Sequence, residues 1–239
     1  MLPPPASRLI AVSCMVKLIF LCRRRPDIDH ARYAELLLEG HVPIALDHHP
    51  TLRKYVVNIV EDCPAGTEEL DSIGELSFAS LADFRERLYD SPEGERIVHR
   101  DVARFMGGAH AYATTEYVHK DVCGPARLGT RSPGVKLICP VKGRPDMSHE
   151  QFVEHWLQRH VPLALQHHPL IAYVTNVVDQ RLSDSGEDWD GIAELHFPSA
   201  AVRAQFYDSS EGERIIRADI AHFIGHGVAY RVAEYVQKI

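Results

Sequence analysis

The chain has 239 residues and a formal net charge of −7, and 45% of its residues are hydrophobic and 25% charged. These proportions are typical of a globular protein, and the mild acidity leaves no basic surface for nucleic acid or an anionic membrane. No apolar run approaches the ~18 residues of a transmembrane helix. Fifteen histidines are an unusual number, and they favour a metal or heme site or acid–base chemistry near neutral pH.

The first residues and the cysteines both indicate a cytoplasmic protein. Residues 1–15 contain three prolines and a broken apolar stretch, which makes a poor signal peptide. We expect this segment to be a disordered tail or a wrongly assigned start, with Met1 and Met15 as the alternative first residues. Five cysteines without a CxxC motif are typical of free thiols in a reducing compartment.

The sequence repeats itself. VKLI at 16–19 returns at 135–138, HVP at 41–43 returns at 160–162, and EGERI at 93–97 returns at 211–215. Such self-similarity predicts two copies of one structural unit. We place the repeats at 16–118 and 135–239, joined by a linker at 119–134 that is rich in Gly, Pro and Ser.

Each repeat is expected to run strand–helix–strand–strand–helix–strand. In the first repeat the expected elements are a strand at 16–22, a helix from Asp29 that ends near Pro43, strands at 54–60 and 73–78, a broken helix at 80–106 and a strand at 111–118. In the second they are a strand at 135–141, a helix from Ser148 to near Pro162, strands at 173–179 and 192–197, a broken helix at 199–224 and a strand at 229–236.

This order is the ferredoxin-like βαββαβ plan. One such unit leaves a face of its sheet uncovered, because both helices pack on the other face. A second copy can cover that face. The fold class is therefore α+β, with two ferredoxin-like repeats forming an intramolecular dimeric α+β barrel and helices outside.

Charged residues interrupt the apolar stripes of the helices. Asp101 and Asp219 each lie in the middle of an apolar stripe on the second helix, and His41 and His160 lie on the apolar face of the first. A buried carboxylate must be paired or hydrogen-bonded. The aspartates are either structural anchors or orienters of a catalytic histidine, and the histidines are either core residues or acid–base catalysts.

The third strand of each repeat carries polar residues on one face. Glu194 and His196 alternate with apolar neighbours, so they point into the barrel if those neighbours pack on the helices. Glu75 is the equivalent of Glu194. Lys17 and Lys136 on the first strands can neutralise the glutamates across the sheet. A purely structural Glu–Lys pair and a substrate-binding face are both open interpretations.

Two further residue patterns bear on the site. Tyr55 and Tyr173 on the second strands can bind a hydroxyl or carbonyl group, or simply pack. The chain contains neither HExxH nor a Cys/His zinc spacing, so we expect no metal site.

These motifs together resemble the EthD family of the dimeric α+β barrel superfamily. The matching features are VKLI followed by RPD, the helix that ends in HVP (closest in the second repeat, from Trp156), the tyrosine-led second strand, the E-L-x-F third strand and SPEGERI or SSEGERI. The resemblance implies a pair of ferredoxin-like units, fused here.

The resemblance also implies a range of functions. Its members are associated with ether degradation beside a cytochrome P450 and with dehydration or decarboxylation of aromatic polyketides, and wider relatives include cyclases, isomerases, cofactor-independent monooxygenases and heme proteins. The family's polar signature maps to His41, His160, Asp101 and Asp219. The repeats differ, because Leu37 stands at the position of Trp156, and Ser77 at that of His196. The second repeat is therefore the better candidate for chemistry.

We expect a cofactor-independent enzyme of the dehydratase, cyclase, isomerase or decarboxylase type that acts on a small hydrophobic, oxygenated or aromatic molecule. The alternatives are an oxidoreductase or oxygenase-accessory protein with heme, and a non-catalytic ligand-binding barrel. No nucleic acid or membrane partner is expected, and the fused pseudo-dimer leaves a further homodimer open. The expected catalytic residues are His160, Asp219, His41 and Asp101, and the expected substrate-binding residues are His196, Glu194, Tyr173, Trp156, Tyr55 and Glu75.

Overall fold

Both repeats contain the expected elements in a computed structural model that describes residues 15–239; the expectations for 1–14 lie outside the described residues. The first repeat comprises β1 (Val16–Arg24), α1 (His30–Glu35), the π-helix η1 (Leu36–His41), α2 (Val42–His48), β2 (Leu52–Asp62), β3 (Ser72–Phe78), α3 (Leu81–Arg87), α4 (Pro92–Val102) and β4 (Met106–Asp121). The second comprises β5 (Val135–Gly143), α5 (His149–His155), the π-helix η2 (Trp156–His160), α6 (Val161–His167), β6 (Ala172–Arg181), β7 (Gly191–Phe197), α7 (Ala200–Ser209), α8 (Glu211–Phe223), β8 (Ile224–Gly227) and β9 (Tyr230–Lys238).

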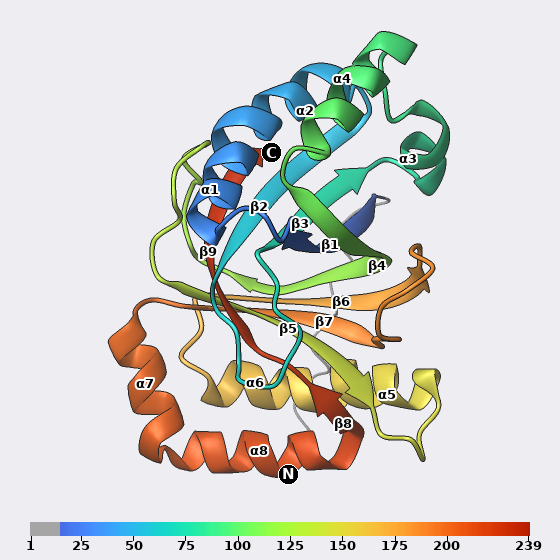
Figure 1. The fold of residues 1–239 in the computed structure, drawn as a ribbon. Helices are drawn as coiled ribbons and strands as arrows, with labels where there is room; N and C mark the ends of the chain where they lie inside the picture. Colours follow the sequence, from blue (N-terminus) through green and yellow to red (C-terminus); the bar gives the residue numbers. More distant parts are fainter. Residues whose placement is uncertain (1–14) are drawn as a thin grey trace.

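The strands close into one antiparallel barrel, which confirms the predicted fold. Their order is β7-β6-β4-β1-β3-β2-β9-β5-β8, and an additional β5–β7 pairing closes the ring. The repeats meet where β4 pairs with β6 and β2 with β9. Because neighbouring strands alternate in direction, β1 and β5 point the same way, and the pseudo-two-fold axis runs along the barrel. The helices of the two repeats cover opposite sides of the barrel (Figure 1).

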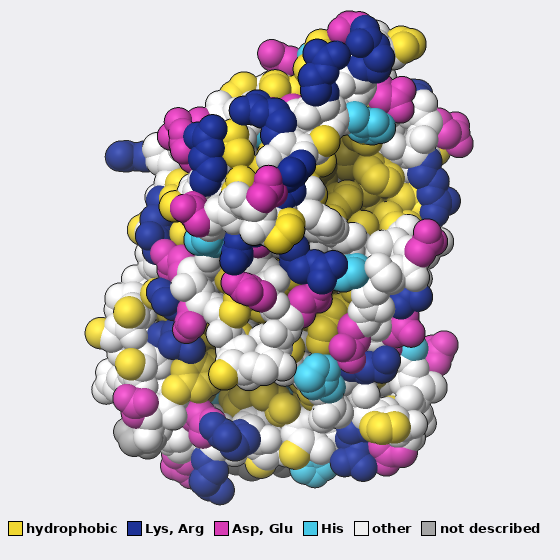
Figure 2. All heavy atoms as spheres, viewed as in Figure 1, with side chains coloured by type: hydrophobic (Ala, Val, Ile, Leu, Met, Phe, Trp, Pro, Cys, Tyr) yellow, Lys and Arg dark blue, Asp and Glu magenta, His cyan; other side chains and the backbone are white. Residues whose placement is uncertain are grey.

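The strand sequences alternate between the barrel interior and the helical layers. On β1, Leu18 packs in the core beneath the helices, whereas Lys17 and Ile19 face inward. Two apolar cores thus lie between sheet and helices, and a third fills part of the barrel interior. On the face that Figure 2 shows, acidic and basic side chains are intermixed, and hydrophobic side chains form the floor of the hollows. No helix among residues 15–239 is long and apolar enough to cross a membrane.

The first helix of each repeat continues past its proline instead of ending there. Pro43 lies at the start of α2, directly after the π-helical turn η1. In that wider turn, the Val42 N–H bonds to the carbonyl of Leu37, five residues back. A proline ring clashes with the carbonyl four residues earlier in a regular α-helix, and the wider turn avoids this clash. The same arrangement surrounds Pro162.

The segment between the repeats packs against the barrel. β4 extends to Asp121, so the connection is shorter than the sequence suggested. The backbone N–H groups of Gly129 and Ser132 donate to the carbonyls of Val236 and Glu234 on β9 at 2.8 Å each. Since β4 ends and β5 begins at the same end of the barrel, this linker (122–134) crosses its mouth.

Candidate functional site

The barrel encloses a cavity of about 800 Å³ at the end crossed by the linker. The opposite end is filled by the third apolar core, which includes Tyr112, Tyr230 and Trp189. The strand sequences explain why one end of the barrel interior is charged and the other apolar. On the inward face of β1, Lys17 comes before Ile19, and on that of β5, Lys136 comes before Ile138. The cavity walls include Lys136, Glu75, Glu116, Glu194, His196 and Glu234, together with linker residues from Cys123 to Pro133.

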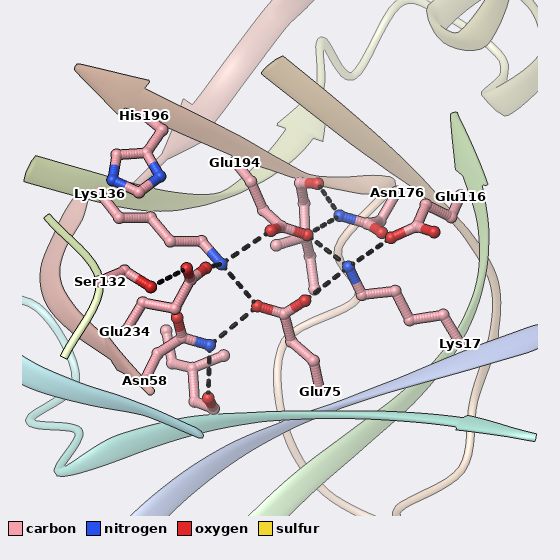
Figure 3. Close-up of polar contacts among 12 residues, drawn as sticks. Lys17, Asn58, Glu75, Glu116, Ser132, Lys136, Asn176, Glu194, His196 and Glu234 are labelled. Carbon is pink, nitrogen blue, oxygen red and sulfur yellow. Dashed lines mark hydrogen bonds and ion pairs between the residues drawn. The ribbon is translucent and has the colours of Figure 1, made fainter. Parts of the chain in front are cut away.

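A buried cluster of lysines and glutamates forms the floor of the cavity (Figure 3). Lys17 Nζ lies 2.6 Å from Glu75, 2.8 Å from Glu116 and 2.5 Å from Glu194. Lys136 Nζ repeats this geometry, at 2.8 Å from Glu75, 2.9 Å from Glu194 and 2.6 Å from its third partner, Glu234. The expected pairing of lysines and glutamates across the barrel is therefore present in both repeats.

The cluster holds its charges rather than exchanging protons. Burial lowers the pKa of both lysines, but the carboxylates around them outweigh it, and the pKa values lie above their ordinary value. Burial likewise raises the pKa of Glu194, yet the two ammoniums bring it well below its usual range. Against the same penalty, Lys136 and Ser132 lower the pKa of Glu234 to about 2. These four groups are thus charged at neutral pH.

His196 lies on the cavity wall next to the cluster, as its position beside Glu194 on β7 predicted. Its Nε2 lies 2.8 Å from the carbonyl oxygen of Pro133, which can only accept, so Nε2 carries the proton. Nδ1 is then the basic nitrogen, 3.9 Å from Cys123 Sγ. Burial raises the pKa of the Cys123 thiol to about 11, so the thiol stays protonated at neutral pH.

The linker residues around His196 were missed by sequence reasoning. Cys123, Ser132 and Pro133 belong to a segment that was interpreted only as a connection. A signal for its close packing was present in Gly134, which has a φ of +89°. A Cβ there would lie 2.4 Å from the carbonyl oxygen of Phe197 and 3.1 Å from His196 Nε2, so this position favours glycine.

The structure brings the predicted His–Asp pairs together, but in the helical layers. His41 Nδ1 lies 3.1 Å from Asp101 Oδ2, and His160 Nδ1 lies 2.8 Å from Asp219 Oδ2. These residues come from helices, which cover the outer face of the sheet, whereas His196 points to its inner face. His160 and His196 are therefore on opposite sides of the sheet and cannot act on one substrate.

Aromatic packing and burial shape the environment of these pairs. The His41 ring contacts Phe105 at 5.5 Å between centroids, and the His160 ring contacts Phe223 at 5.1 Å. Burial lowers the pKa of His41, and Asp101 only partly offsets this. Burial raises the pKa of Asp219, but hydrogen bonds from His160 and His155 outweigh it, and the pKa lies below its ordinary value.

The three large aromatic residues proposed to bind substrate are buried on the helical side of the sheet. Tyr55 lies in the core of the first repeat, and Trp156 and Tyr173 lie in that of the second. Trp156 Nε1 donates to the Tyr173 hydroxyl at 3.4 Å. Trp156 packs over Gly191, where a Cβ would lie 2.1 Å from the indole ring. None of the three lines the barrel cavity; Glu75, Glu194 and His196 do.

The residues of the cavity do not fit a heme group. An axial histidine must direct a free nitrogen at the iron, but His196 Nε2 is bonded to the Pro133 carbonyl and Nδ1 faces Cys123. The carboxylates of the floor would also repel the propionates of a heme. Within residues 15–239, no group of three or more His, Cys, Asp or Glu side chains could hold a metal ion.

A comparison with known families identifies one of the repeats. Residues 144–227 match the model of the EthD domain. The second repeat carries an EthD domain. The match does not cover the first repeat, whose likeness to this EthD domain rests on the internal sequence repeat and the shared topology. The chain matches no curated protein sequence.

Solved structures with the same fold superpose on both repeats. A candidate monooxygenase from Fusobacterium nucleatum superposes with a TM-score of 0.63 at 6% identity, covering 94% of each chain. An anthrone oxidase-like protein has a TM-score of 0.61 at 10% identity, covering 93% of each chain. A candidate monooxygenase from Lactobacillus acidophilus has a TM-score of 0.53 at 9% identity, covering 94% of this chain and 97% of its own. At these identities the likeness shows the dimeric α+β barrel fold alone.

Proposed function

We propose that this protein is a cofactor-independent acid–base enzyme that acts on a small hydrophobic, oxygenated or aromatic molecule in the barrel cavity. The observation that carries the proposal is His196, held in one tautomer on the wall of an enclosed space above a cluster of fixed charges. The cavity volume of about 800 Å³ lies in the range of small-molecule sites.

In this proposal His196 is the group that moves the proton. The Pro133 carbonyl fixes the proton on Nε2, so Nδ1 accepts a proton from the substrate or, once protonated, returns one. His196 makes a small contribution to the low pKa of Glu234, after the larger ones of Lys136 and Ser132.

The charges of the floor favour one type of reaction. Four carboxylates surround two ammoniums, so the cluster contributes a negative potential to the cavity, which Lys54, Arg127 and Arg131 also line. Such a potential stabilises positive charge that develops in a transition state and opposes an enolate or other oxyanion. Protonation of a leaving hydroxyl by His196 breaks the C–O bond, releases water and develops positive charge on the substrate. The neutral Nδ1 then takes the proton from the neighbouring carbon, which forms the double bond and restores the protonated ring. Dehydration by this route suits the cavity better than proton abstraction next to a carbonyl.

A second candidate site is supported by the His160–Asp219 pair. Asp219 accepts the Nδ1 proton of His160 at 2.8 Å, which leaves Nε2 as the basic nitrogen, as in an oriented catalytic histidine. We rank it below the cavity because His160 packs on Phe223 and does not line the barrel cavity.

The test is a turnover screen with hydroxylated aromatic and alicyclic compounds, followed by mass spectrometry. The proposal expects one compound class to lose a molecule of water in the presence of the wild-type protein. The His196→Ala variant should convert it at least about a hundredfold more slowly. Conversion by His196→Ala at the wild-type rate, or no conversion of any compound by the wild type, would overturn the proposal.

A further inference from the structure

The floor of the barrel cavity carries more negative charge than its own residues neutralise. With every group ionised, the glutamates at 75, 116, 194 and 234 and the lysines at 17 and 136 carry a formal charge of minus two. Both lysines are at least 95% buried. Lys54, Arg127 and Arg131 also line the cavity, but within residues 15–239 none of them forms a salt bridge with these four glutamates. Burying uncompensated charge is costly, so a further positive group beside the cluster would be stabilising.

The donors within the cluster are fully used. An ammonium has three N–H groups, and Lys17 directs them to Glu75, Glu116 and Glu194. Lys136 likewise contacts three carboxylates, and Ser132 donates to Glu234 at 2.7 Å. The cluster therefore has no further ammonium proton to offer its remaining acceptor oxygens.

Two amide oxygens in the cluster accept no hydrogen bond from the described part of the chain. The side chains of Asn58 and Asn176 are fully buried, and within residues 15–239 their Oδ1 atoms have no hydrogen-bond partner. Their orientation is fixed, because each Nδ2 donates to a backbone carbonyl at 2.9 Å and to Glu75 or Glu194 at 2.8 Å. If either amide group were flipped, its oxygen would face the backbone carbonyl and the carboxylate, which are both hydrogen-bond acceptors.

The unsatisfied oxygens lie beside the carboxylates that face the cavity. Asn58 is directly opposite Glu234 in the β2–β9 pair, and Asn176 is directly opposite Glu116 in the β4–β6 pair. Figure 3 shows each amide oxygen turned toward the side of the cluster where that glutamate lies. Side chains opposite one another in a sheet are close neighbours. Each half of the barrel thus combines one excess negative charge with one unpaired acceptor.

We infer that the floor of the cavity is a cation site that binds the protonated amine of an organic ligand at Glu234 and at its pseudo-symmetric counterpart, Glu116. This inference rests on the proposed function, since it names the charge of the ligand that the cavity takes. Both glutamates line the cavity, and their side chains keep 17% and 14% of their exposure. The amide dipoles of Asn58 and Asn176 add to the negative potential at these two positions.

An organic ammonium fits this site better than a metal ion. Lys136 Nζ lies 2.6 Å from Glu234, and Lys17 Nζ lies 2.8 Å from Glu116, so a divalent ion bound to either carboxylate would meet a fixed positive charge at close range. An ammonium brings one charge and several N–H donors. The space above the floor, about 800 Å³, accommodates the organic part of the ligand.

The test is calorimetric titration of the wild-type protein with benzylammonium, benzyl alcohol and benzoate, which share one ring and differ in charge. We expect benzylammonium to bind at least about tenfold more tightly than benzyl alcohol, and benzoate to bind more weakly than both. Equal affinity for the amine and the alcohol, or tighter binding of benzoate, would overturn the inference without any variant.

Two variants locate the site. Glu234→Gln and Glu116→Gln should each weaken benzylammonium binding by about tenfold and leave benzyl alcohol unchanged. Glu93→Gln removes the same charge from an exposed helix position and should leave both affinities unchanged; unchanged amine binding in Glu234→Gln and Glu116→Gln would contradict the inference. Because binding does not need His196, His196→Ala should still prefer the amine, which separates failure of this inference from failure of the proposed reaction.

Discussion

The two repeats share the same framework but differ on the cavity wall. Lys17 and Lys136 make equivalent contacts to the central glutamates, so both halves contribute equally to the charged floor. The position of His196 in the second repeat is occupied by Ser77 in the first. The difference teaches that duplication preserved the lysine–glutamate framework of the barrel, whereas the histidine lines the cavity on one side only.

A second difference concerns a histidine at the end of the first helix. His49 Nδ1 lies 3.1 Å from the Leu88 carbonyl, so the ring can donate a hydrogen bond to it. The ring of the equivalent His168 packs on Phe206 at 4.4 Å between centroids, tilted by 33°, and its buried Nδ1 has no hydrogen-bond partner among residues 15–239. Burial lowers the pKa of His168 to about 4.

Breaking the duplicated framework should have the largest effect. Lys136→Met leaves Glu234 without its ammonium and leaves Glu194 with Lys17 alone, and we expect the free energy of unfolding to fall by about 3–5 kcal/mol. Lys17→Met should cost a similar amount if the halves are equivalent. Urea unfolding followed by circular dichroism measures both. A loss below about 1 kcal/mol in both variants would show that the cluster is not the buried, paired network described here.

The pH dependence of stability should report on the buried His168. The unfolded chain binds a proton on an exposed imidazole near pH 6.5, whereas the folded chain does so on His168 only near pH 4. The free energy of unfolding should therefore decrease as the pH falls from 7 to 5, by up to about 2 kcal/mol from this residue.

The matched variant is His168→Phe, which keeps an aromatic ring packed on Phe206 and removes the titrating group. Chemical unfolding at pH 7 and at pH 5 should show a smaller loss of stability in this variant than in the wild type. An equally steep loss in both proteins would mean that other groups account for the acid sensitivity.

The helical His–Asp pairs should show the smallest effect. Asp219→Asn weakens two charge-assisted hydrogen bonds, from His160 and His155, and should lower the free energy of unfolding by about 1–2 kcal/mol. Asp101→Asn should behave alike, because Asp101 pairs with His41 and Arg104. Thermal or urea unfolding checks both. A Glu211→Gln control addresses an exposed pair with Arg214 on α8 and should change stability little.

Much of the fold could be predicted because its signals are local or repeated. The internal repeat predicted two equal halves, and the alternation around Glu194 and His196 predicted an inward-facing polar pair. The apolar stripe around Asp219 predicted only indirectly that this residue contacts the first helix. A stripe shows which face of a helix is buried, but not whether a catalytic cavity lies there. The sheet separates His160 from the cavity, and this separation is a property of the tertiary structure.

The linker shows why the rest of the site could not be predicted. Cys123 and Pro133 lie in a stretch without hydrophobic periodicity, so nothing local indicates its path. Its position depends on hydrogen bonds to β9, made by Gly129 and Ser132, which are distant in sequence. Likewise, the first helix continues past Pro43 because a π-helical turn avoids the clash between the proline ring and the preceding turn. The general rule that proline ends or kinks a helix does not predict this.

The most direct test of the central claim compares kcat/KM of His196→Ala and His160→Ala on one converted compound. If the reactive group lies on the cavity wall, His196→Ala should lose about a hundredfold or more, while His160→Ala should stay within about threefold of the wild type once its folding is verified. Ser77→Ala is the matched control from the first repeat and should be indistinguishable from the wild type. A full rate in His196→Ala together with a large loss in His160→Ala would contradict the account and place the chemistry in the helical layer.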